Sequence, residues 1–178
     1  AVVGTRRMSE YGRMVTEKFV RGLVGAGWII VSGLARGVDR VAHETCLSAG
    51  RHACVGGKTI AVLAHGLDMT YPPEHVELRK QIVKSGGLVI SEHPGGVSLT
   101  KQNLAVRNRI VVGISQCVLV TESPKSSGTK ITVRFAADQG KDVYIVPGPI
   151  NDPTYEGSVE LIRDGCIPVG KVEDIMSE

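Results

Sequence analysis

The chain has 178 residues, of which 42% are hydrophobic and 22% are charged, and its formal net charge at pH 7 is +3. This composition is typical of a globular domain and excludes a disordered or coiled-coil chain. The sequence shows no apolar stretch long enough to span a bilayer, no signal peptide and no lipidation motif, so we expect a cytoplasmic protein with no membrane association.

The cysteines are scattered along the chain, at Cys46, Cys54, Cys117 and Cys166. They form no Cys-x-x-Cys pair, and no histidine stands at metal-ligand spacing from them. We therefore expect reduced thiols and no metal site.

Short apolar runs recur along the chain, and each run ends at or near glycine, serine or proline. These runs predict strands at 2–3, 28–31, 59–63, 88–90, 118–120 and 143–146. Because nearly all of their residues are valine, isoleucine or leucine, we expect the strands to be buried on both faces, as in a parallel sheet.

Helical spacing appears between the runs. After Ser9, a candidate N-cap, apolar residues fall at Tyr11, Val15, Phe19 and Leu23. Further helices are predicted near 38–49, 74–85, 104–114, 129–139 and 157–164, and a surface excursion at 50–57. This alternation predicts an α/β fold of the doubly wound, extended Rossmann-like type, with about six or more mostly parallel strands and helices on both faces. We expect a single domain over 1–178.

A glycine-rich segment follows the second predicted strand, with Ser32, Gly33, Arg36 and Gly37 in it. Small residues let backbone N–H groups approach an anion, a following helix N-terminus favours negative charge, and Arg36 adds a positive charge. A phosphate-bearing ligand is one interpretation of this segment. A tight turn chosen only for its backbone geometry is the other.

Basic residues concentrate in the loops that follow the predicted strands. They are Arg6, Arg7, Arg36, Lys101, Arg107, Arg109, Lys125 and Lys130. Loops at the carboxyl ends of parallel strands open onto one crevice, where such a cluster can neutralise phosphates. The alternative is that Arg107 or Arg109 pairs with an internal carboxylate such as Asp39 or Glu122. Aromatic residues near these loops are few, so extensive base stacking is not predicted.

Several ordered motifs carry a family resemblance that runs from residue 2 to residue 166. They are 3–6 (Val-Gly-Thr-Arg), 32–39 (Ser-Gly-Leu-Ala-Arg-Gly-Val-Asp), 66–68 with 71–74, 107–110 (Arg-Asn-Arg-Ile), 127–129 (Ser-Gly-Thr), 146–148 and 161–165. In this series the chain resembles the DNA-processing protein A family, also called DprA or Smf.

The resemblance implies a Rossmann-like domain that binds single-stranded DNA and hands it to a RecA-type recombinase, chiefly in natural transformation and DNA recombination. It also implies a homodimer without enzymatic activity or a cofactor. Motif by motif, it implies a DNA pocket lined by Thr5, Arg6, Gly33, Arg36, Lys101, Asn108 and Arg109. Position in the loops adds Ser32, Gly37, Asn103, Arg107, Ser127, Gly128 and Thr129 as candidate phosphate contacts.

The chain departs from the family pattern at Leu104, where the family usually carries phenylalanine, so an apolar contact at the pocket edge is changed. We expect the chain to hold the Rossmann-like domain alone, without the small helical and winged-helix domains that flank it in the family.

Two other functions compete with DNA binding. The first is a nucleotide-binding module, because the same loops would hold a mononucleotide. The second is a nucleoside-monophosphate phosphoribohydrolase of the related Rossmann group, which needs a catalytic glutamate after its Gly-Thr pair. Here Gly128 and Thr129 are followed by Lys130, and neither Glu92 nor Glu122 has an evident catalytic partner. His43 stands four residues after Asp39, which predicts a local structural contact between them rather than catalysis.

Overall fold

Short parallel strands form the centre of the computed structural model, which describes residues 1–50 and 57–176. The strands are β1 (Val2–Val3), β2 (Ile30–Ser32), β3 (Thr59–Leu63), β4 (Leu88–Ser91), β5 (Val118–Val120), β6 (Val143–Ile145) and β7 (Ile167–Pro168). They form a four-stranded sheet in the order β1-β5-β6-β7 and a three-stranded sheet in the order β2-β3-β4. Each of these pairings is parallel, so the predicted fold class is confirmed.

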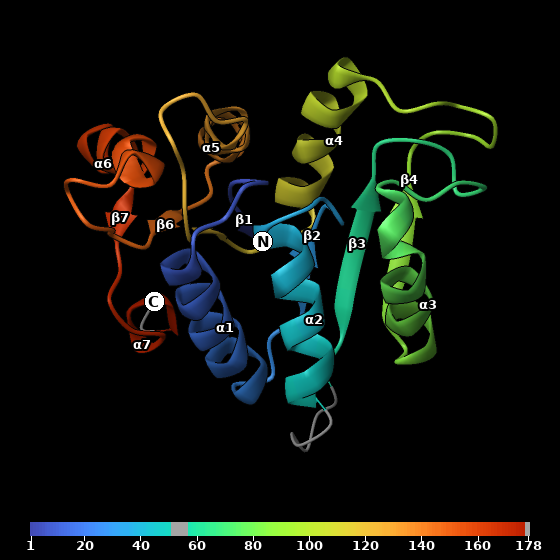
Figure 1. Cartoon of the computed structure of the whole chain (residues 1–178), viewed down its shortest axis with the longest axis horizontal. Helices are drawn as coiled ribbons and strands as arrows, with labels where there is room; N and C mark the ends of the chain where they lie inside the picture. Colours follow the sequence, from blue (N-terminus) through green and yellow to red (C-terminus); the bar gives the residue numbers. More distant parts are fainter. Residues whose placement is uncertain (51–56, 177–178) are drawn as a thin grey trace.

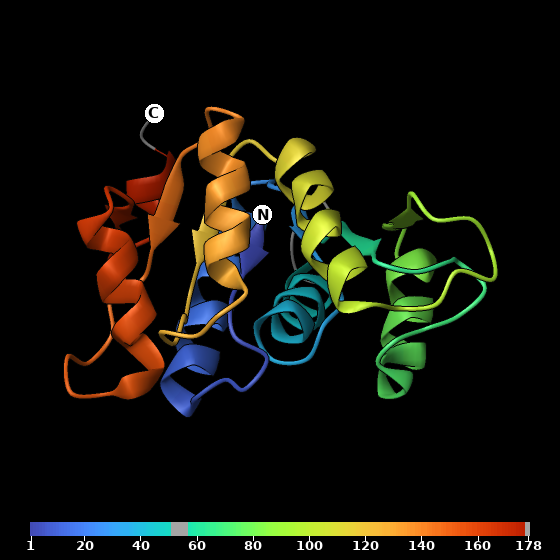
Figure 2. The same cartoon turned by 90° about the horizontal axis from the view of Figure 1, so that it is seen from above.

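Helices cover the strands from two sides (Figures 1 and 2). They are α1 (Glu10–Gly25), α2 (Val38–Gly50), α3 (Val76–Lys84), α4 (Lys101–Gly113), α5 (Thr129–Asp138), α6 (Glu156–Arg163) and α7 (Glu173–Met176), with one-turn 3₁₀ helices at Pro73–His75 and Pro153–Tyr155. The view from above places α1 and α2 on one side of the strands and α4 and α5 on the other (Figure 2). Among residues 1–50 and 57–176, no helix is both long and apolar enough to cross a bilayer.

Successive strand residues supply two different hydrophobic cores. Val2 packs in one core with Phe19 of α1, whereas its neighbour Val3 packs in the other with Val112 of α4. Side chains of successive strand residues point to opposite faces of a sheet, so a strand covered on both sides is apolar throughout. This is the physical reason why unbroken valine and isoleucine runs predict these strands correctly.

The order of the strands reverses beside β1. The chain moves from β1 outward through β2, β3 and β4, and then returns to place β5 on the other side of β1. No backbone ladder joins β1 to β2 within the described residues. Instead the hydroxyl of the buried Ser32 donates a 2.7 Å hydrogen bond to the carbonyl of Val2. In open parallel sheets, ligands bind at the carboxyl ends of the strands where the order reverses.

Most predicted elements agree with the observed ones. The predictions do not include the four-residue helix α7, and β2 spans Ile30–Ser32 rather than 28–31. Strand β7 is missed because it has only two residues, both exposed, so it has no apolar run. Helix α4 begins at Lys101 rather than at 104, because the Thr100 hydroxyl accepts the N–H of Asn103 and caps the helix earlier. Of the predicted excursion at 50–57, Gly50 ends α2, and residues 51–56 lie outside the described part of the chain.

A buried carboxylate holds the start of α1. Glu122 follows β5 and accepts hydrogen bonds from the Ser9 N–H at 3.0 Å, from the Ser9 hydroxyl at 2.8 Å and from the Tyr155 hydroxyl at 3.4 Å. A Cβ at Gly12 would overlap the Glu122 side chain, which explains the glycine in the first turn. Burial raises the pKa of Glu122, although the hydrogen bonds from Ser9 oppose this rise.

We expect Glu122→Gln to gain stability relative to the unsubstituted protein as the pH rises above 4.5, the ordinary pKa of glutamate. A carboxyl whose pKa is raised by folding binds its proton more tightly in the native state, so its contribution is full below the unfolded pKa and is lost as the pH rises through the folded pKa. A native-state pKa that is higher by one corresponds to about 1.4 kcal/mol. Urea unfolding of both proteins between pH 4 and pH 8 measures the difference. The exposed Glu77→Gln serves as control, and an equal pH dependence in all three proteins would contradict the expectation.

Candidate functional site

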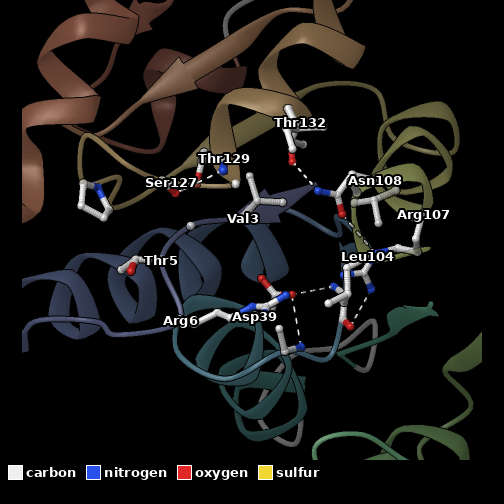
Figure 3. Close-up of a pocket in the computed structure, with 18 of the residues that line it drawn as sticks. Val3, Thr5, Arg6, Asp39, Leu104, Arg107, Asn108, Ser127, Thr129 and Thr132 are labelled. Carbon is white, nitrogen blue, oxygen red and sulfur yellow. Dashed lines mark hydrogen bonds between the residues drawn. The ribbon is translucent and has the colours of Figure 1, made fainter. Parts of the chain in front are cut away.

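A pocket of about 850 Å³ lies at the carboxyl ends of β1, β2 and β5 (Figure 3). The loops after β1, β2 and β5 line it, at 4–7, at Gly33 and Ala35, and at Pro124 and 126–128. Helix α4 and the first turn of α5 complete the wall, and Figure 3 shows Leu104, Arg107 and Asn108 on one side and Ser127, Thr129 and Thr132 on another. The crevice predicted from the strand order is therefore present.

The loop after β2 is closed by hydrogen bonds within itself. One carboxylate oxygen of Asp39, in the first turn of α2, accepts the N–H groups of Gly33 at 3.1 Å and Ala35 at 3.2 Å. Gly37 has a φ of +73°, and a Cβ there would overlap the Thr5 carbonyl, so only glycine lets this loop lie against the loop after β1. The N–H groups of Gly33 and Ala35 therefore stabilise the turn itself. This agrees with the second interpretation of the segment, a tight turn chosen for its backbone geometry.

Arg107 is a buried arginine that ties α4 to the strand ends. The residue is only 4% exposed, and its side chain donates hydrogen bonds to the carbonyl of Gly33 at 2.7 Å and to that of Val62. Its Nε donates to Asn108, which in turn donates to the Thr132 hydroxyl at 2.9 Å. Burial lowers the pKa of Arg107, and the charge of Asp39 opposes that change. The guanidinium of Arg107 is therefore held by groups inside the protein.

Carboxylates neutralise four further basic residues of the predicted cluster. Arg36 pairs with Glu74 at 2.5 Å, and this contact lowers the pKa of Glu74 to about 2. Arg109 pairs with Glu92. On the other side of the pocket, Lys125 and Lys130 pair with Glu160, at 3.9 Å and 2.6 Å.

Three cations are left for a ligand. Arg6, Arg7 and Lys101 all line the pocket, all are exposed, and none forms an ion pair with a described residue. Figure 3 shows Arg6 reaching from the loop after β1 toward Asp39. The pocket thus carries positive charge, contributed by two separate elements, that has no ion-pair partner in the part of the chain that the structure describes.

Hydroxyl groups and the start of α5 form another wall of the pocket. The hydroxyls of Ser127 and Thr129 are 2.7 Å apart, and Ser127 also accepts the N–H of Thr129 at 3.1 Å. Gly128, the N-cap of α5, leaves open space where a Cβ would be. Hydrogen-bond donors at a helix N-terminus favour an anion, so this wall complements the three cations.

The structure gathers most of the predicted site residues into this pocket. Those that line it are Thr5, Arg6, Gly33, Lys101, Arg107, Asn108, Ser127, Gly128 and Thr129. Those that do not are Ser32, Arg36, Gly37, Asn103 and Arg109. Arg36 lies on a neighbouring hollow, and Asn103 donates instead to the Ser98 carbonyl.

Sequence reasoning does not single out Ile131 and Thr132, which also line the pocket. Thr132 lies one helical turn after Thr129, so the i,i+3 spacing along α5 would have identified it once Thr129 was chosen.

The predicted contact between His43 and Asp39 is wrong. His43 is fully buried and its Nδ1 lies 2.7 Å from the Thr59 hydroxyl, while Asp39 faces the loop after β2. Burial lowers the pKa of His43 to about 3, so this side chain is neutral at physiological pH. Cys46, Cys117 and Cys166 are free thiols, and Cys54 lies outside the described residues. Over residues 1–50 and 57–176, no three histidine, cysteine or acidic side chains gather as a metal site.

The doubly wound parallel strands, with a pocket at the point where their order reverses, define a Rossmann-like protein. Comparison with protein families makes the assignment specific. The chain belongs to the DNA recombination-mediator protein A family, whose model matches residues 1–178. The resemblance predicted from the sequence is therefore confirmed.

Two curated relatives show the extent of the similarity. Protein Smf of Escherichia coli (strain K12) is 42% identical over 176 residues, which cover 99% of this chain and 46% of that protein. The DNA processing protein DprA of Bacillus subtilis (strain 168) is 36% identical over 177 residues, covering 99% and 57%. The chain spans about half the length of the curated relatives it matches.

Two solved structures share the fold. The X-ray structure of DNA processing protein A from Streptococcus pneumoniae matches with a TM-score of 0.87 and 37% identity, covering 99% of this chain and 60% of that one. A structure of DNA processing protein A from Helicobacter pylori, which concerns the single-stranded DNA binding mode of that protein, matches with a TM-score of 0.86 and 28% identity, covering 99% and 77%.

Two arginines of α4 provide a matched pair for a stability test. We expect Arg107→Ala to lower the free energy of unfolding by about 3 kcal/mol or more, because two carbonyls lose charged donors and the buried Asp39 loses its nearby cation. Arg109→Ala removes only an exposed ion pair and should cost less than about 1 kcal/mol. Urea denaturation measures both values. Equal losses in the two variants would show that Arg107 has no special structural role.

Proposed function

We propose that this chain binds single-stranded DNA by its sugar-phosphate backbone, in the pocket at the strand ends. The observation that carries the proposal is the convergence of Arg6, Arg7 and Lys101 on one open pocket without internal ion-pair partners among the described residues. Charged side chains that stabilise the fold have partners of opposite charge within the protein. Charges left unpaired beside a helix N-terminus are suited to an anion from outside.

The geometry favours a polyanion over a single phosphate. Arg6 and Arg7 come from the loop after β1, whereas Lys101 begins α4 on another wall of the pocket. Several phosphates of one strand can contact these groups together, and each contact releases counterions from the DNA. No aromatic side chain is among the described residues that line the pocket, so phosphate contacts supply most of the affinity there.

Family membership supports the rest of the proposal. The chain belongs to a family of DNA recombination mediators. We propose that the protein hands the bound strand to a RecA-type recombinase and acts as a cytoplasmic homodimer. We further propose that the domain is not an enzyme. Asp39 is the one carboxylate among the described lining residues. This carboxylate accepts hydrogen bonds from the N–H groups of Gly33 and Ala35, which hold a loop together, so Asp39 is not available to act on a substrate.

A mononucleotide is the second candidate ligand. The hydroxyls of Ser127 and Thr129 at the start of α5 would accommodate one phosphate group. A mononucleotide bound at this wall would need fewer of the pocket's cations than a strand of several phosphates does, so competition experiments separate the two ligands.

Fluorescence anisotropy of a labelled oligothymidine, titrated with the protein at several salt concentrations, tests the proposal. We expect binding that weakens steeply with salt, and little displacement by unlabelled duplex or by a mononucleotide. Displacement by a mononucleotide at low concentration would favour the second candidate. The absence of binding at low salt would overturn the proposal.

Substitution of the unpaired cations should change the salt dependence in a defined way. We expect Arg6→Ala and Lys101→Ala each to reduce the slope of log affinity against log salt by about 0.7 for every phosphate that the variant no longer neutralises. Lys84→Ala is the control, because this exposed residue ends α3 and does not line the pocket. Slopes that stay unchanged in the Arg6 and Lys101 variants would exclude this pocket as the phosphate site.

Arg36 and Arg109 are expected to contribute less. Each is already paired with a glutamate, so a DNA phosphate must displace Glu74 or Glu92 to reach it. We expect Arg36→Ala and Arg109→Ala to weaken binding by a smaller factor than Arg6→Ala in the same anisotropy titration. Larger losses than for Arg6→Ala would show that the glutamates leave the arginines when DNA binds.

A further inference from the structure

A second, smaller hollow adjoins the pocket and brings a paired arginine next to an unpaired one. It shares part of its lining with the pocket, namely Arg6, Gly33, Ala35, Leu104 and Arg107. Arg36 lines the hollow but not the pocket. Because Arg6 faces both spaces, a strand that contacts Arg6 can continue over the hollow toward Arg36.

The carboxylate of Glu74 occupies the guanidinium of Arg36 in the way that a phosphate would. The Nε of Arg36 donates a 2.5 Å hydrogen bond to this carboxylate. A guanidinium binds carboxylates and phosphates through the same planar set of N–H donors, so the two anions compete for them. The hydrogen bond from Arg36 lowers the pKa of Glu74 to about 2, so Glu74 keeps its negative charge at neutral pH.

The backbone holds the two side chains opposite each other. Glu74 lies in the 3₁₀ helix Pro73–His75, and the buried His75 donates from Nδ1 to the carbonyl of Leu34 at 2.9 Å. Leu34 stands two residues before Arg36 and has a φ of +58°, an uncommon conformation for leucine. The helix that carries the glutamate is therefore fastened to the loop that carries the arginine.

The ion pair itself is open to water. Of the side-chain surface, 53% is exposed at Arg36 and 46% at Glu74. Water and salt screen such a pair, so the fold depends little on it. A carboxylate tethered beside the guanidinium nevertheless has a high local concentration, so a phosphate of a passing strand has to compete with it.

We propose that Glu74 is an internal competitor of DNA, whose carboxylate occupies Arg36 and thereby keeps this arginine from contacting the phosphates of a bound strand. The proposal rests on the proposed function, because it requires single-stranded DNA in the adjoining pocket. It adds to the cations that raise the affinity for DNA one residue that lowers it.

Anisotropy titrations of labelled oligothymidine with the Glu74→Gln protein test the proposal. We expect this variant to bind about fivefold more tightly than the unsubstituted protein in about 0.1 M salt, and its slope of log affinity against log salt to be steeper by about 0.7. These are the effects of one additional phosphate contact, because a slope of 0.7 corresponds to about fivefold over one decade of salt concentration. Glu74→Ala should show the same gain, since either substitution removes the charge.

The gain should require Arg36. In the Arg36→Ala protein, we expect Glu74→Gln to raise the affinity by less than about twofold, because there it removes only a screened repulsion between the carboxylate and the strand. Glu77→Gln is the matched control. Glu77 is also exposed and paired, with Lys80 at 2.7 Å, but its partner lines neither the pocket nor the hollow, so this variant should bind as the unsubstituted protein does.

Other results overturn the proposal. An unchanged or weaker affinity in both Glu74 variants shows that Glu74 does not restrain Arg36. An equal gain in the Arg36→Ala protein, or in Glu77→Gln, shows a general effect of net charge. If the unsubstituted protein binds oligothymidine with a steep salt slope, these results refute the internal competitor alone. If neither the unsubstituted protein nor Glu74→Gln binds oligothymidine, the proposed function fails and the internal competitor fails with it.

Discussion

The buried guanidinium of Arg107 is the interaction on which the pocket depends. It fills the space between α4 and the carboxyl ends of β2 and β3, where the carbonyls of Gly33 and Val62 would otherwise have no donor from α4. Asp39 supplies the opposite charge and at the same time holds the amides of Gly33 and Ala35. Removal of either charge would leave the other uncompensated in a region of low dielectric. The shape of the pocket wall and the stability of the fold are therefore linked.

The fold can be predicted from the sequence because its signals are local. Apolar runs ending in glycine or serine identify strands such as Leu88–Ser91, and alternation with helical spacing identifies the doubly wound class. The signal disappears where a strand is short and exposed, as at Ile167–Pro168, which adds a pairing to β6 without adding to the core. The predicted start of α4 is too late because the apolar pattern begins at Leu104, while the hydroxyl of Thr100 determines the helix start.

The site is only partly predictable because its electrostatics are not local. Arg107 and Arg109 stand two residues apart in one motif, yet the first is buried against two strands and the second is paired with Glu92 on the surface. Arg36 and Glu74 are 38 residues apart in the chain, and no spacing rule connects them. Sequence reasoning can gather cations into one crevice through the strand order. Which of them remain unpaired depends on contacts between distant segments, and these appear only in the folded structure.

The junction between β1 and β2 links ligand binding in the pocket to the cohesion of the two sheets. The two sheets meet without a backbone ladder there, and the hydrogen bond from the Ser32 hydroxyl to the Val2 carbonyl takes its place. The pocket lies over this junction, with 4–7 and 126–129 following strands of one sheet and Gly33 and Ala35 following a strand of the other. A ligand that contacts both groups of loops acts as a cross-link between the sheets. The two effects are thermodynamically linked. A change that stabilises the junction in its bound geometry raises the affinity for the ligand, and a bound ligand stabilises the junction by the same free energy.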